Sequence, residues 1–201
     1  ISVVDPFLTI PILAFLIIAI IRKNRFISFL GVIYIFLYLG FGVLQANRAE
    51  EVGKKIASTR GHEKIKLTIK PSLGNLFLWK VIYKDKGFYY VDAVRLFTEK
   101  EYCEGTKIKK FNYLTDLNDL NKKSQQYLDI KRFSWFSQGY LGVGKEKNII
   151  TDVRYSAVPN EVDGLWGIKI DTSKIHTEHV DWVVNRSCLL YTSPSPRDLS
   201  T

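Results

Sequence analysis

A short polar stretch near the C-terminal end offers the first candidate binding site. Arg154, Asn160 and Glu161 lie close together in the sequence. A guanidinium presents a planar fork of donors that matches a carboxylate or a phosphate, so these residues could bind an anionic substrate. A structural interpretation fits equally: Asp152 and Arg154, two positions apart on a strand, share a face and can pair. Pro159-Asn160 would then simply mark a turn. We favour the structural interpretation.

A pair of histidines offers a candidate metal site. His176 and His179 are separated by two residues, a spacing that puts both imidazoles on one face of a helix. Imidazole is a common zinc ligand. The surrounding residues are typical of loop and strand, where this spacing turns the two side chains to opposite faces. The chain shows no Ser-His-Asp elbow, phosphate-binding loop or cysteine cluster, so none of these signatures supports an enzyme.

Asp5 is the third candidate, because it stands at the mouth of a long apolar run. Ionisable groups embedded in a membrane are functional by default. An Asp directly before a Pro is also typical of a helix start, since the carboxylate can cap free N–H groups and Pro suits the first helical position. We predict that Asp5 caps a helix. Its contribution to a site formed with other membrane helices is the alternative.

Two apolar runs predict that residues 1–46 form two transmembrane helices. Residues 7–21 are apolar except for Thr9, and residues 26–46 carry no charge. A hydrocarbon core about 30 Å thick needs roughly 20 helical residues, a length that the second run meets and the first does not quite reach. The basic link at residues 22–25 turns the chain back. A buried hairpin in a soluble protein is the alternative.

The charges of the link predict an orientation. Arg22, Lys23 and Arg25 are positive, and positive residues in short loops face the cytoplasm. Everything after residue 46 is then predicted to lie on the opposite, periplasmic or extracellular side. The mixed charges just after residue 46 oppose this only weakly.

Residues 47–187 predict an α+β extramembrane domain with a mainly antiparallel sheet. A helix is expected to continue out of the membrane and to end at Gly61. Alternating and β-rich runs follow, two of them joined by a hairpin loop that contains Asp85 and Gly87. The predicted strands are residues 65–70, 77–83, 88–96, 107–111, 140–143, 149–155, 165–170 and 179–184, and a further helix spans residues 124–136.

The formal net charge of +9 indicates possible partners. Basic residues beside a membrane are attracted to anionic lipid head groups by about 1 kcal/mol each. An ordinary solvated surface explains them equally well. No nucleic-acid partner is expected, because the chain shows no recognition-helix or RNP-like motif.

Both ends of the chain are unusual. The chain contains no Met, so we expect Ile1 to be an internal position of a longer protein. Residues 188–201 resemble a translated sequencing-library adapter and are set aside as an artefactual tail. Cys103 is the only cysteine before that tail, which predicts no disulfide and a small packed residue.

Several strings resemble the bacterial membrane-bound metal-dependent hydrolases, a poorly characterised inner-membrane family. The resemblance extends from Val3 to about Trp182. The strings are VVDP (3–6), PSLGN (71–75) with Trp79, RFSWF (132–136), DVRYSAVPNE (152–161) and LWGI (165–168).

The resemblance implies a metal-dependent hydrolase of the inner membrane that uses a divalent metal ion. The family's metal-binding His and Asp residues lie upstream of Val3, and no position here matches them. The metal site is therefore expected in a region before this fragment, and the fragment itself is expected to be inactive and free of stoichiometric metal. The alternative is a non-enzymatic, membrane-anchored domain that binds lipid head groups, envelope material or a protein partner. Substrate, metal and oligomeric state stay open.

Overall fold

The computed structural model describes residues 5–63, 65–72, 74, 76–97, 100–118 and 120–184. The chain divides into two compact units. The first contains residues 1–85 and 91–105, and the second contains residues 86–90 and 106–201.

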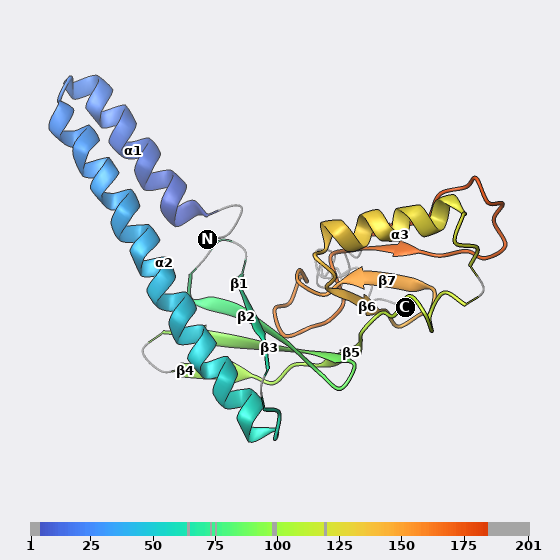
Figure 1. Cartoon of the computed structure of the whole chain (residues 1–201). Coiled ribbons are helices and arrows are strands. Elements are labelled where there is room, and N and C mark those ends of the chain that lie inside the picture. The colour runs from blue at the N-terminus through green and yellow to red at the C-terminus, as the bar shows by residue number, and fades with distance from the viewer. Residues whose placement is uncertain are drawn as a thin grey trace, which may run out of the picture. The chain divides into compact units, whose positions relative to one another are not determined.

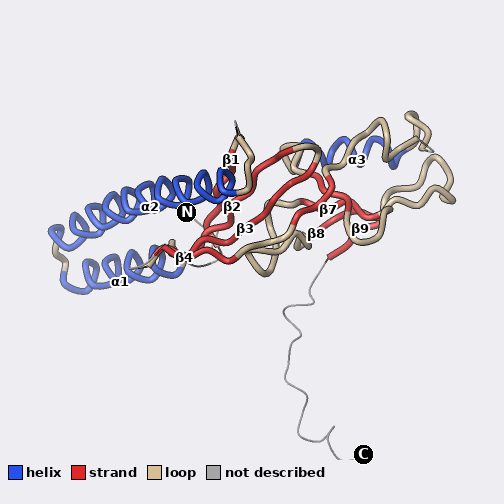
Figure 2. Tube along the Cα trace, turned by 90° about the horizontal axis from the view of Figure 1, so that it is seen from below, coloured by secondary structure: helices blue, strands red, loops and turns tan. Residues whose placement is uncertain are grey.

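Two helices form the N-terminal part of the first unit. Helix α1 (Pro6–Arg22) and helix α2 (Arg25–Thr59) lie side by side and antiparallel (Figures 1 and 2). Lys23 adopts a left-handed conformation with φ 49°, and the Asn24 side chain accepts from the Phe26 N–H, which starts α2 directly after the turn. α2 runs without a break through the apolar run and the predicted juxtamembrane helix. It ends before Gly61, as predicted.

The apolar side chains of this hairpin point outward. Along both helices large Ile, Leu, Phe and Val side chains are exposed, including Ile20, Ile21, Phe36 and Leu37. Soluble proteins rarely leave such a continuous apolar surface uncovered. Among the described helices α2 is the one long and apolar enough to cross a membrane, whereas α1 is shorter. The N-terminal part therefore has the surface of a membrane-associated element.

The last turns of α2 pack on an antiparallel sheet (Figure 1). A Cβ on Gly53 would lie 2.8 Å from Cγ1 of Val81, so the helix approaches the sheet too closely for a larger residue. Lys86 and Gly87, with φ of 43° and 83°, make the predicted hairpin turn. The strands are β1 (Leu67–Pro71), β2 (Leu78–Asp85), β3 (Phe88–Leu96) and β4 (Lys100–Cys103), in the order β1-β2-β3-β4.

The second unit has its own sheet and helix. Helix α3 (Gln125–Phe136) begins at Ser124, whose hydroxyl accepts from the Tyr127 N–H. It covers one face of the sheet (Figure 1) around a core that includes Ile130, Phe133 and Ile150. The strands are β6 (Leu141–Val143), β7 (Ile149–Asp152), β8 (Trp166–Lys169) and β9 (Asp181–Val184), all antiparallel in that order, while β5 (Lys107–Lys109) pairs with the first residues of β3.

The structure confirms N-terminal helices followed by antiparallel sheets and differs in detail. Two sheets replace the single one expected, and β4 lacked a sequence signal. β7 ends at Asp152 because that carboxylate accepts from the Arg154 N–H and turns the chain. Cys103 is exposed at the end of β4, so its predicted packing is wrong. Residues 188–201 lie outside the described residues.

Candidate functional site

Asp5 is held by α2 and does not cap α1. Its backbone occupies the cap position, but its side chain makes no capping bond. The carboxylate is 3% exposed, and the Tyr38 hydroxyl lies 2.7 and 2.8 Å from its two oxygens. The capping prediction is therefore wrong. The physical reason is that a phenolic donor on the neighbouring helix satisfies the carboxylate better than the free N–H groups of its own helix.

Gln45 marks the point where α2 passes from exposed to packed. Its side chain is 1% exposed, and Nε2 donates to the carbonyl oxygens of Leu76 and Leu96 at 3.5 and 3.3 Å. Oε1 accepts from Arg48 at 2.8 Å. Because these hydrogen bonds are buried, they fix the position of α2 along its axis relative to the ends of β2 and β3.

A charged cluster lies at the C-terminal end of α2. Arg60 donates both terminal nitrogens to Asp92, with each N···O distance at 2.7 Å, and Asp92 is fully buried. Arg60 also reaches Tyr83 at 3.0 Å and Glu104 at 3.2 Å. Hydrogen bonding to Asp92 is the main cause that raises the pKa of Arg60, so its charge is permanent.

His62 extends this cluster. Its Nδ1 lies 3.1 Å from the Tyr83 hydroxyl and its Nε2 lies 3.5 Å from an Asp85 carboxylate oxygen. Sequence reasoning missed the whole cluster. Asp92 could have indicated it, because a carboxylate inside a β-rich run is expected to be buried and therefore to need a positively charged or hydrogen-bonding partner.

A hollow of about 350 Å³ adjoins this cluster. Its lining combines apolar α2 side chains with Lys55, Arg60 and Glu104. Arg60 and Glu104 in this lining are paired with each other, and Arg60 is also paired with Asp92.

Arg154 forms a buried ion pair in the second unit. Its Nη2 lies 2.8 Å from Asp152 Oδ2, its Nε donates to Oδ1 at 3.0 Å, and Nη2 also donates to the Phe136 carbonyl oxygen. Both side chains are almost fully buried. The spacing of two therefore produces the pair that the structural interpretation expects, although Arg154 lies just beyond β7.

The other two residues of that candidate lie elsewhere in the loop. The Asn160 carbonyl oxygen accepts from the Thr106 N–H at 3.3 Å. Glu161 lines a hollow of about 450 Å³ together with Lys107, Lys109 and Lys145. Arg154 therefore belongs to an internal ion pair, whereas Glu161 lines a separate surface hollow.

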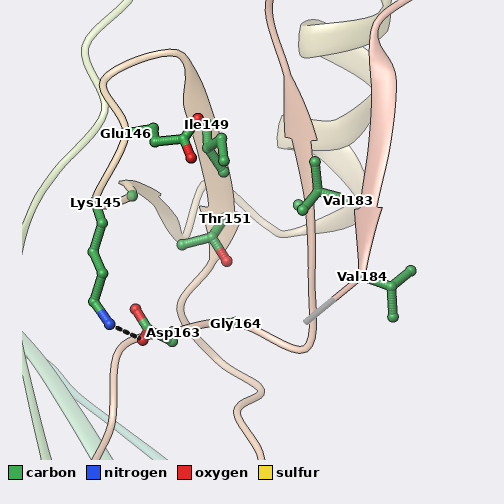
Figure 3. A pocket seen from close by; sticks show the side chains of 10 residues that line it. Lys145, Glu146, Ile149, Thr151, Asp163, Gly164, Val183 and Val184 are labelled. Atoms are coloured by element: carbon green, nitrogen blue, oxygen red, sulfur yellow. Dashed lines mark hydrogen bonds and ion pairs between the residues drawn. The ribbon is translucent and has the colours of Figure 1, made fainter. Parts of the chain in front are cut away.

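A second open hollow, of about 430 Å³, lies on the same unit (Figure 3). Its lining includes Thr151 and Gly167, which are paired across β7 and β8. At its rim Lys145 bonds Asp163 at 2.7 Å. The hollow is within the size range of ligand pockets.

The two histidines lie in a loop before β9. His179 Nδ1 is 2.8 Å from Asp129 Oδ2, while the His176 carbonyl oxygen accepts from the Gln125 N–H. Burial raises the pKa of Asp129, but hydrogen bonds from Gln125 and His179 outweigh it and leave that pKa below its usual value. Within the described part of the chain, no group of three or more His, Cys, Asp or Glu residues could hold a metal ion.

Comparison of the chain with protein-family models, with curated proteins and with solved structures finds no match.

The Arg60–Asp92 pair gives a stability prediction. Replacing the fully buried Asp92 by Asn removes the charge that bonds both terminal nitrogens of Arg60, whose side chain is 20% exposed, and is expected to cost about 2 kcal/mol of unfolding free energy. Urea unfolding followed by the fluorescence of buried Trp79 measures this loss. Glu101→Gln is the matched control, because it removes the carboxylate of an exposed pair with Arg95. It should cost less than about 1 kcal/mol. Equal losses in both variants would contradict the prediction.

Tyr89 gives a pH prediction. Its hydroxyl donates to the Gly139 carbonyl oxygen at 2.9 Å, and burial, with nearby Tyr140 and Asp152, raises the pKa of Tyr89 to about 12. Because the folded pKa exceeds the ordinary value of 10, this group's contribution to stability is full below pH 10 and is lost as the pH rises through 12. Wild type should lose about 2 kcal/mol more unfolding free energy than Tyr89→Phe over that interval.

The same variant should lose about 1 kcal/mol at neutral pH, because its hydrogen bond is missing. Urea titrations at pH 8, 10, 11 and 12 provide the measurement. Tyr102→Phe changes an exposed phenol and serves as the control. A Tyr89→Phe curve parallel to that of wild type would refute the assignment.

Proposed function

We propose that this chain is the membrane-anchoring hairpin and the extramembrane α+β part of a bacterial inner-membrane protein. The observation that carries the proposal is the continuous exposed apolar surface along α1 and α2. At about 1.5 Å per residue, the apolar part of α2 from Arg25 to Gln45 measures about 30 Å, the thickness of a hydrocarbon core. α1 pairs with it and would cross with it as a hairpin.

The charges of the link support one orientation. Arg22, Lys23 and Arg25 would lie in the cytoplasm, and the two sheets would lie on the periplasmic side. The paired, buried residues around Gln45 would then mark the outer surface of the membrane, where α2 begins to pack on protein.

We predict the labelling pattern of single cysteines in intact spheroplasts. In a background of Cys103→Ser and Cys188→Ser, Asn24→Cys should resist a membrane-impermeant maleimide until the membrane is opened. Ser58→Cys, at the exposed end of α2, should react at once. The protein should also stay in the membrane pellet at alkaline pH. The opposite pattern would overturn the orientation, and reaction at both positions would overturn the hairpin.

For the activity, we propose a metal-dependent hydrolase, on the basis of the strings that resemble those of the bacterial membrane-bound metal-dependent hydrolases. One structural observation favours it: Asp5 is a buried carboxylate at the N-terminal end of α1, and its side chain does not cap that helix. The described residues do not themselves offer a metal site. Asp5 would complete a metal site whose other ligands come from membrane helices upstream of Val3 in the natural protein, and no catalytic step is assigned to the residues described.

Metal analysis of the natural full-length protein tests this proposal. The wild type should contain about one divalent ion per chain or more, as hydrolytic metal sites do. Asp5→Asn should lower that content, whereas Tyr38→Phe should lower thermal stability and leave the metal in place. Asp163→Asn, at a surface pair, is the control. A wild-type protein without metal would overturn the hydrolase proposal. It would favour the non-enzymatic alternative, a domain that binds lipid head groups, envelope material or a protein partner.

A further inference from the structure

The outward face of α3 carries large apolar side chains that are exposed, although the edge of Phe136 meets the Trp166 ring of β8. The Trp135 side chain is 84% exposed, and Leu128 and Phe136 are also exposed. The inward face is already satisfied by the buried residues Ile130 and Phe133. A tryptophan left almost wholly in water is uncommon in a stable soluble surface.

The same face is positively charged. Lys131 and Arg132 are exposed between Leu128 and Trp135, and Lys122 and Lys123 are exposed just before the helix. At 100° per residue, positions 128, 131, 132, 135 and 136 fall within an arc of about 140°. We call these five residues the α3 outer face.

No exposed carboxylate balances these charges within the helix. Asp129 is the acidic residue of α3, and its side chain is 11% exposed. Its Oδ1 accepts from Gln125 at 2.9 Å, and its Oδ2 lies 2.8 Å from Nδ1 of His179. Arg132 Nη1 lies 3.7 Å from Oδ1. The Asp129 charge is therefore turned toward the loop before β9, and the outer face keeps a net positive charge.

We infer that the α3 outer face binds the surface of a bilayer that contains anionic phospholipid. Tryptophan is the side chain most typical of the head-group region, and interleaved Lys and Arg are attracted to anionic lipid. An amphipathic helix with aromatic and basic residues on its exposed side is typical of interfacial binding. Protein-binding surfaces are instead depleted of lysine around their aromatic anchors.

This inference rests on the proposed membrane anchor in one respect, because the hairpin would keep the unit near a bilayer. The two proposals are tested separately. The whole chain is reconstituted into lipid nanodiscs, and its co-elution with discs of phosphatidylcholine alone, which the α3 outer face should not retain, reports on the hairpin. A photoreactive benzoylphenylalanine at position 135 then reports on α3.

Residue 135 should cross-link to lipid in discs that contain phosphatidylglycerol, with about tenfold lower yield in discs of phosphatidylcholine alone. A photoreactive residue at position 114 is the matched control, since Leu114 is exposed but lies outside α3. It should give little lipid cross-link in either disc. Equal yields at position 135 in the two lipids, or none above the control, would overturn the inference even if the protein co-elutes with the discs.

Charge reversal separates binding from folding. Lys131→Glu with Arg132→Glu should reduce the lipid cross-link at position 135 about tenfold, because two attractive charges become repulsive. Lys84→Glu with Lys147→Glu makes the same change of charge at exposed positions elsewhere and should leave the yield unchanged. Both double variants should be folded at the temperature of the cross-linking experiment, as measured by circular dichroism. Equal reductions in the two, or cross-linking of residue 135 to a protein instead of lipid in isolated cell membranes, would overturn the inference.

Discussion

The continuity of α2 is the constraint on which the rest of the first unit depends. One uninterrupted helix of 35 residues serves two environments: an apolar length with exposed side chains and a final part that packs on the first sheet. Because the helix is continuous, its apolar part and its packed part cannot move independently. The position of α2 relative to the sheet must therefore be fixed near Gln45, where packing begins. The buried Gln45 does this by donating to the carbonyl oxygens of Leu76, just before β2, and of Leu96, at the end of β3, and Gly53 lets the helix approach β2 closely.

Local patterns in the sequence were enough to predict most of the elements. The Asn24 and Ser124 caps, the stop at Gly61 and the Lys86-Gly87 turn each act over a few residues, and each appears in the structure where the sequence indicates a boundary. The Asp152–Arg154 pair was predictable for the same reason, since its partners are two residues apart. Local steric and hydrogen-bonding rules determine such features before the chain is packed.

Interactions between distant residues could not be predicted in the same way. Asp5 accepts a hydrogen bond from Tyr38 because the hairpin brings the start of α1 beside the middle of α2. This contact between distant residues replaces the local capping bond that the sequence predicted. Asp92 was recognisable as a charge in an apolar run, but its partner Arg60 is fixed only when α2 packs on the sheet. The division of the strands into two sheets is likewise a matter of pairing, and short strands such as β4 carry too little pattern to reveal it.

The distribution of charge also separates the structural polar groups from those available to a partner. Asp92 and Asp152 are fully buried, and each has a charged donor within the fold, because an unpaired buried carboxylate would cost several kcal/mol. These groups therefore hold elements together. The α3 outer face has the opposite character: exposed, cationic and aromatic, and spread along a helix whose inner side is already packed. The core of the unit does not include Trp135, so this side chain is available to the lipid surface that we propose.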